Sequence, residues 1–107
     1  MDNAALLVML KSNLEIITDY MDEAARQAKD TELTQYIQAA ETYIDREGIT
    51  LHLDDIGDCM LIVMYAAWLY EKRRAVSAGY GQAPGPMPRM LRWNLNNRLF
   101  AEKLNDD

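Results

Sequence analysis

The chain has 107 residues, of which 50% are hydrophobic and 26% are charged. This length and balance fit one globular domain and exclude a disordered tail. Helix breakers are few, and of the five Gly and three Pro residues, six lie between Gly79 and Pro88. We therefore expect a single all-α domain over residues 1–107.

The net charge of −6 is unevenly distributed along the chain. Residues 1–58 contain 13 acidic and 4 basic side chains, a net charge of −9, whereas residues 59–107 contain 4 acidic and 7 basic ones, a net charge of +3. An acidic chain has no overall attraction for nucleic acid, because phosphate binding depends on Lys and Arg. A chain with two unlike halves is instead suited to pair with copies of itself.

Several classes of protein are excluded by simple counts. Cys59 and His52 are the only cysteine and histidine, which excludes a disulfide scaffold and a Cys/His zinc site. The first thirty residues lack the pattern of a signal peptide, so we expect an intracellular protein. The longest apolar run, at 59–70, has 12 residues. As a helix it would span about 18 Å, less than the roughly 30 Å of a bilayer core, so no membrane anchor is expected.

The first thirty residues contain one clear helix and one ambiguous segment. Residues 4–14 are predicted to form a short amphipathic helix, because leucines recur at helical spacing. The leucines are Leu6, Leu7, Leu10 and Leu14. Residues 15–30 fit either a helix or an ordered loop, since their alanines favour helix but offer little to bury. Ile16 and Ile17 are expected to be buried, and Asp19 is a candidate helix cap.

A second helix is predicted over residues 31–47. Thr31 has the character of an N-cap, and Gly48 supplies the left-handed conformation that ends many helices. One apolar face consists of Leu33, Tyr36, Ile37, Ala40 and Ile44. Residues 49–53 are then expected to form a short extended link.

A third helix is predicted over residues 55–74, with Asp54 or Asp55 as its cap. Acidic residues at its start and basic residues at its end match the helix dipole. This helix is apolar nearly all round. One side contains Ile56, Met60, Val63, Met64, Ala67 and Trp68, and the rest includes Leu61, Ile62, Tyr65 and Leu69. Because so short a chain has few partners to cover both sides, we expect another subunit to bury part of this helix.

The last third of the chain is predicted to contain a loop and a final helix. Residues 75–86 are rich in Ser, Gly and Pro and are expected to form a mobile loop. Pro88 is suited to the first turn of a helix over 88–104. Its apolar stripe is predicted to consist of Leu91, Leu95, Leu99 and Leu104. Residues 105–107 are expected to fray.

The sequence favours no catalytic, metal or cofactor site. His52 lies near Asp54 and Asp55, but this spacing has little specificity and favours a surface or capping role. Cys59 precedes apolar residues and is expected to be a small buried hydrophobe. The chain contains no Gly-rich phosphate loop, no Gly-x-Ser-x-Gly and no His-Glu-x-x-His. We therefore expect a protein that is not an enzyme and needs no cofactor.

Two binding functions remain as alternatives. The helix over 88–104 carries Arg89, Arg92, Arg98 and Trp93, which is compatible with a small DNA-binding regulator that uses this helix. Large flexible apolar residues also gather on the two helices that flank the loop. They are Met60, Met64, Trp68, Met87, Met90 and Trp93. Met, Arg and aromatic residues are enriched in the cores of protein interfaces, which favours a subunit of an assembly.

Four segments carry a resemblance to a known family. They are LLVMLKSNLEI, YIQAAETYIDREGI, DCMLIVMYAAWLYEKRR and MPRMLRWNLNNRLF. In order they contain a short leading helix, an amphipathic helix that ends at Gly, an apolar helix that ends in Trp-Leu-Tyr-x-Lys-Arg, and a final helix that begins Pro-Arg. This order resembles the small head-tail connector, or adaptor, proteins of tailed bacteriophages and prophages.

The resemblance implies a structural virion assembly protein with no catalytic residue. Such a protein would form a homo-oligomeric ring of roughly a dozen copies beneath the portal protein. The ring would extend the DNA channel, join head to tail, and present a surface to the next tail-completion or stopper protein. Packaged DNA would pass through it without sequence-specific binding. The expected location is the virion neck, after assembly in the bacterial cytoplasm.

The resemblance and the composition together predict a subunit or portal interface. Its expected residues are Met64, Trp68, Tyr70, Arg89, Arg92, Trp93, Arg98 and Phe100. A ring needs a heterologous interface, and the two unlike charged halves offer one. Charge reversal by Arg92→Glu with Arg98→Glu is therefore expected to weaken assembly more than it destabilises the fold.

Overall fold

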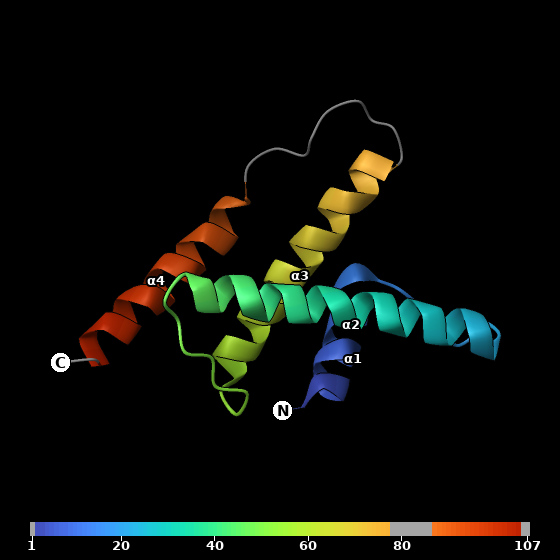
Figure 1. Cartoon of the computed structure of the whole chain (residues 1–107), viewed down its shortest axis with the longest axis horizontal. Coiled ribbons are helices and arrows are strands. Elements are labelled where there is room, and N and C mark those ends of the chain that lie inside the picture. The colour runs from blue at the N-terminus through green and yellow to red at the C-terminus, as the bar shows by residue number, and fades with distance from the viewer. Residues whose placement is uncertain (1, 78–86, 106–107) are drawn as a thin grey trace.

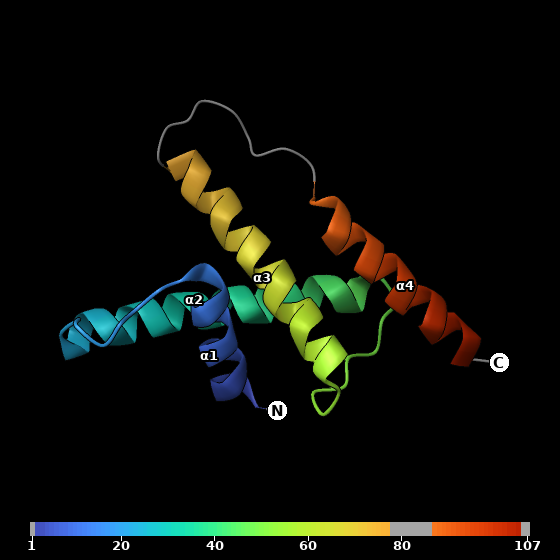
Figure 2. The same ribbon diagram turned by 180° about the vertical axis from the view of Figure 1, so that it is seen from behind.

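The computed structural model describes residues 2–77 and 87–105, which form four helices and confirm the predicted all-α class. The helices are α1 (Asn3–Leu14), α2 (Glu23–Arg46), α3 (Ile56–Ser77) and α4 (Arg89–Asn105). They lie in two layers, with α2 on one side and α1, α3 and α4 on the other (Figure 1 and Figure 2). Since α3 packs against each of the other three helices, it is the centre of the fold.

Helix α1 agrees with the predicted extent within one residue, and hydrogen bonds satisfy free backbone groups at both of its ends. The side chain of Asp2 accepts a hydrogen bond from the Ala5 N–H (2.9 Å) and caps the first turn. At the other end Glu15 adopts the left-handed conformation, with φ of 58°, and Ile16 N–H donates to the Lys11 carbonyl (2.9 Å). A left-handed residue other than Gly costs about 1 kcal/mol, and here it turns the chain towards α2.

Helix α2 begins eight residues before the predicted start, so the assignment of Thr31 as N-cap was wrong. Asp22 is the cap, and its side chain accepts from the Ala25 N–H (2.8 Å). Asp19 does not take this role. The first two turns contain exposed alanines at 24, 25 and 28, whose high helix propensity extends the helix without any apolar face. The ambiguous segment is therefore a link over 15–22 followed by helix.

The end of α2 confirms the predicted stop at Gly48. Gly48 has φ of +100°, a conformation that side chains rarely adopt. The helix ends at Arg46, and Gly48 N–H donates to the Asp45 carbonyl (3.0 Å). A Cβ on Gly48 would lie 3.5 Å from Leu99 Cδ1, so the turn also approaches α4.

Helix α3 has the predicted cap but a later end. Asp55 accepts a hydrogen bond from the Gly57 N–H through its side chain (2.8 Å) and one from the Cys59 N–H through its carbonyl (3.1 Å). The helix continues to Ser77, so the expectation that residues 75–77 belong to a loop was wrong. No Gly or Pro lies between Gly57 and Gly79, so nothing in these residues breaks the helix. The rest of the expected loop, 78–86, lies outside the described residues.

Helix α4 starts directly after Pro88, whose carbonyl accepts the Arg92 N–H (3.0 Å). Asn105 was expected to fray but is the last residue of the helix. Residues 106–107 lie outside the described residues. Leu91 and Leu95 are buried as predicted, but Leu104 is 61% exposed. Leu104 follows Leu99 by five residues, which turns it about 140° away from the buried stripe.

The buried apolar side chains of the described residues form one cluster between the two layers. The α2 face contributes Leu33, Ile37, Ala40 and Ile44, as predicted, and Tyr36 lies at its edge. From α3 the cluster takes Cys59, Leu61, Ile62, Val63, Tyr65, Ala66 and Ala67. Ile16 is half-buried, but Ile17 is 65% exposed and does not join the core as expected.

Candidate functional site

One side of α3 lacks the cover that the rest of the helix has. Of the side that contains Ile56, Met60, Met64 and Trp68, Val63 and Ala67 are buried. Ile56 and Met60 are exposed, and Met64 and Trp68 are half-buried. The other side of α3, with Leu61, Ile62 and Tyr65, packs into the core. Helix α3 is therefore closed towards α2 and open on the opposite face.

The open face of α3 forms an apolar trough between α1 and α4. Figure 2 shows the ribbons of α1, α3 and α4 from the side opposite to α2. Three hollows of about 530, 340 and 430 Å³ share Met64 in their walls, so they meet at this residue. We define the apolar trough by six apolar side chains that line it, which are Val8, Met9, Met60, Met64, Trp68 and Met90. Methionines adapt their shape to a partner more easily than branched residues do. The trough is thus suited to receive an apolar element of another protein.

Helix α4 carries a second apolar surface that points away from the core. We define the α4 outer stripe by Met90, Trp93, Phe100 and Leu104, each between 61% and 64% exposed. At 100° per residue this stripe lies on the side of α4 opposite to Leu91, Leu95 and Leu99. Arg89 and Lys103 are exposed on the same helix. The predicted interface residues Trp93, Phe100 and Arg89 are therefore all accessible to a partner.

Arg98 is different, because the fold itself occupies its side chain. Its Nε donates to Asp58 Oδ1 (2.7 Å), its Nη1 to Glu102 (2.8 Å) and its Nη2 to the Thr50 carbonyl (2.7 Å). Asp58 is only 1% exposed, and the His52 N–H donates to its other oxygen (2.9 Å). Burial alone raises the pKa of Asp58, but the hydrogen bonds from Arg98 and His52 outweigh it and hold this pKa below its ordinary value.

These contacts argue against the expected effect of reversing Arg92 and Arg98 together, because Arg98 is part of the fold. A carboxylate in place of the Arg98 guanidinium would face Asp58 and Glu102 and leave Asp58 buried without a cation, which destabilises the fold strongly. Arg92 also has a partner within the chain, since its guanidinium bonds Glu47 (2.8 Å). Sequence reasoning missed this network, because Asp58 lies forty residues from Arg98.

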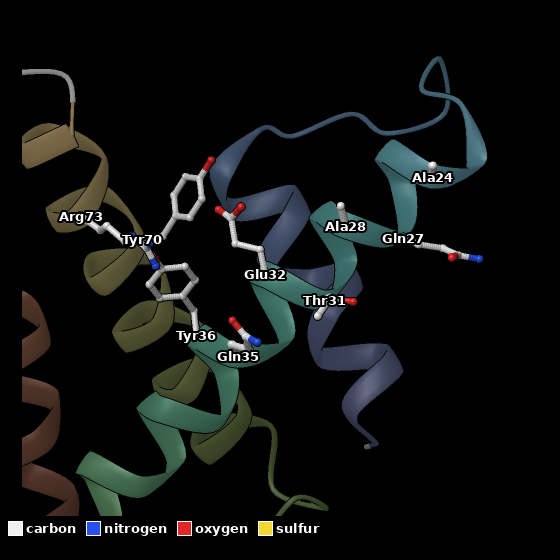
Figure 3. Close-up of a pocket in the computed structure, with 9 residues that line it drawn as sticks. All are labelled: Ala24, Gln27, Ala28, Thr31, Glu32, Gln35, Tyr36, Tyr70 and Arg73. Atoms are coloured by element: carbon white, nitrogen blue, oxygen red, sulfur yellow. The ribbon is translucent and has the colours of Figure 1, made fainter.

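Tyr70, the remaining predicted interface residue, lies in a separate polar groove between α2 and α3 (Figure 3). The groove has a volume of about 820 Å³, and the ring of Tyr70 meets that of Tyr36 edge to face (5.6 Å). Lys29 Nζ lies 5.4 Å from the centre of the Tyr70 ring, and Arg73 donates to the Tyr36 hydroxyl (3.4 Å). Small α2 side chains, Ala24, Ala28 and Thr31, form its floor. These contacts hold α2 against α3, so Tyr70 has a structural role.

The residues considered for chemistry also have structural roles. Cys59 is buried, and its Sγ lies 3.2 Å from the Leu53 carbonyl that it bonds. Burial raises the pKa of its thiol, which disfavours the thiolate. Within residues 2–77 and 87–105, no group of three or more His, Cys, Asp or Glu side chains is placed to hold a metal ion. None of the described helices has the length and apolarity needed to cross a membrane.

Comparison with known proteins found no matching family model, curated protein or solved structure. The geometry of the two apolar surfaces is therefore the basis for a functional assignment. Two of the three arginines on α4 are held in ion pairs within the chain, which leaves Arg89 as the one without a described partner. This arrangement offers less to a DNA phosphate backbone than the sequence pattern indicated.

Proposed function

We propose that this protein is a structural subunit of a phage head-tail connector, which packs its apolar trough against the portal protein in the virion neck. The observation that carries the proposal is the exposed apolar face of α3, continued by Val8 and Met9 on α1 and by Met90 on α4. Contiguous exposed apolar surface is unusual on a protein that acts alone, and it marks a site of association.

The overall shape supports a mechanical role. The molecule measures 51 × 34 × 18 Å, so it is a flat body only two helix layers thick. The trough lies between α1, α3 and α4. These three helices lie in front of α2 in Figure 2. A flat subunit can join its neighbours through its narrow ends and keep a broad face free for a different protein. The ring of connector subunits would use this face to fasten itself to the portal.

The resemblance of four segments to connector proteins indicates which assembly this is. It supports a ring under the portal, through which DNA passes to the tail, with a stopper protein bound on the far side. The net charge of −6 suits such a channel, because carboxylates do not retain the phosphates of moving DNA. The proposed role of the trough involves binding and no chemical reaction, because its residues act through their shape and the burial of apolar surface.

The test is to place one negative charge in the trough and measure binding to the portal protein of the same phage. Met60→Glu puts a carboxylate on the exposed part of α3, and Gln38→Glu adds the same charge to the exposed side of α2. Burying an unpaired charge is costly, so we expect Met60→Glu to weaken binding at least tenfold. Gln38→Glu should bind like the wild type. Circular dichroism would verify that both variants are folded.

Equal binding of both variants to the portal would show that the trough is not the docking face. A wild-type chain that binds no portal would overturn the connector proposal itself. Sequence-dependent binding of duplex DNA at physiological salt, measured by gel shift, would instead support the regulator that uses α4.

A further inference from the structure

The two ends of the long axis carry complementary surfaces. Helix α4 lies at one end (Figure 1). It carries the α4 outer stripe, which is flanked by Arg89 and Lys103. At the other end is the link before α2, where Ile17 and Tyr20 are 65% and 79% exposed. We define this second surface as the acidic edge, residues 17–23. It contains the carboxylates of Asp19, Asp22 and Glu23.

The backbone of the acidic edge is held in place by several hydrogen bonds. Arg26 donates to the carbonyls of Thr18 (3.4 Å), Asp19 (3.3 Å) and Met21 (3.3 Å). Lys11 donates to Thr18 Oγ1 (3.3 Å) and pairs with Asp30 (2.6 Å). Thr18 itself is only 6% exposed. Ile17 and Tyr20 thus project into solvent from a segment that is tied down on both sides.

The charges of the two surfaces are opposite, and most of them have no ion pair within the chain. In the described residues the exposed side chains of Arg89 and Lys103 have no ion pair, and neither do those of Asp19 and Asp22. Arg26, the basic residue beside the acidic edge, is directed to backbone carbonyls and to Glu23. Each surface therefore combines exposed apolar side chains with charges of one sign.

From this arrangement we infer that the acidic edge of one copy docks on the α4 outer stripe of the next. The inference rests on the proposed function and deepens it, because it assigns the contact by which copies join in the ring. Trp93 and Phe100 are two helical turns apart, about 10 Å along α4. The smaller Asn97 lies between them and leaves room for the Tyr20 ring of the next copy.

Two copies do not fit together through α4 alone. An antiparallel pair of outer stripes would bring Arg89 of one copy against Lys103 of the other, and like charges repel. Because the two surfaces of the inferred contact are different and lie at opposite ends, the contact is heterologous. Repetition of a heterologous contact gives a closed ring when the rotation closes.

A charge exchange tests the contact by light scattering over a concentration series. The first variant, Arg89→Glu with Lys103→Glu, makes the flanks of the outer stripe acidic. The second, Asp19→Lys with Glu23→Lys, makes the acidic edge basic. We expect each variant alone to associate at least tenfold more weakly than the wild type. An equimolar mixture, or all four changes in one chain, should restore association, because opposite charges meet again.

The possible results distinguish this contact from different modes of association. If the second variant assembled like the wild type, the contact would be between α4 stripes or elsewhere, and the inference would be overturned. The inference would also be overturned if the mixture stayed as dissociated as its components. A wild type that stays monomeric with and without portal would overturn it as well. Restored association without portal binding would keep this contact and reject the connector role. If portal binding persisted and neither variant changed association, the connector role would be kept and this contact would be rejected.

Discussion

Helices α2 and α4 both pack one apolar face onto the body of the protein, yet their opposite faces differ. On the outer side of α2, Tyr43 is the one large exposed hydrophobic residue, and it is 42% exposed. The outer side of α4 carries four such residues, all above 60%. One apolar stripe is enough to hold a helix in a small domain. The second stripe on α4 does nothing for the isolated chain, which is why it indicates a contact with another molecule.

The largest expected effect concerns the ion pair that holds α4 to α3. Asp58→Asn leaves the buried side of Arg98 without its counter-charge, so we expect a loss of about 3 kcal/mol in the free energy of unfolding. Urea denaturation measures this loss. Asp45→Asn, on the exposed side of α2, is the matched control and should change little. Equal stability of the two variants would show that this pair does not hold α4 in place.

The same pair predicts how stability depends on pH. The pKa of Asp58 is lower in the folded protein than its ordinary value of 3.8, so its contribution is complete above that value. Stability should fall as the pH decreases through the folded pKa, because the carboxylate then takes up a proton. The wild type should therefore lose more stability below about pH 4 than Asp58→Asn does. Parallel pH curves for the two proteins would contradict this assignment.

A smaller effect distinguishes the two faces of α4 directly. Leu95→Ala removes a fully buried side chain, and we expect it to lower the free energy of unfolding by about 2.5 kcal/mol. Leu104→Ala, on the outer stripe, should stay within about 0.5 kcal/mol of the wild type. Thermal or urea unfolding of both variants provides the measurement. Comparable losses would mean that the outer stripe also stabilises the isolated chain, and the contrast with α2 would disappear.

The smallest effect concerns the beginning of α2. Asp22→Ala removes the cap of the first turn and is expected to cost about 1 kcal/mol. Amide hydrogen exchange should become faster in residues 23–30 and remain unchanged near Ile37. Asp19→Ala is the control, because its side chain bonds nothing within the described residues. Equal exchange in the two variants would show that the helix does not depend on this cap.

The periodicity of apolar residues predicted the helices that bury a stripe of apolar side chains. It did not predict helix where no such stripe is present. The starts of α1 and α4 and the stop at Gly48 agree with the structure within one residue. The first two turns of α2 lie in the segment whose sequence fits either a helix or an ordered loop, because their alanines bury nothing and propensity alone decides them. Leu104 was assigned to the wrong face, since a step of five residues leaves the buried stripe.

The candidate site could be predicted only in its apolar part. The expectation that so short a chain cannot cover all of α3 agrees with the exposed positions of Ile56 and Met60. Burial of this part by another subunit stays a prediction. The i, i+3 spacing of Met90 and Trp93, followed by Phe100 and Leu104 at i, i+4, was an available signal for the outer stripe. No pattern in the sequence relates Arg98 to Asp58, because long-range ion pairs depend on how the helices pack. That is why a structural arginine was interpreted as an interface residue.

The pairing of Arg98 with Asp58 has a consequence for where the chain can be divided. A fragment that ends with α3 would keep Asp58 in an apolar setting with no cation beside it, and it would uncover the core side chains against which Leu91 and Leu95 pack. The first three helices are therefore not an autonomous folding unit. We expect deletion of α4 to remove the proposed binding surface and also to unfold the remainder. Substitutions on the outer face of α4 are therefore needed to test its proposed role in association separately from its role in folding.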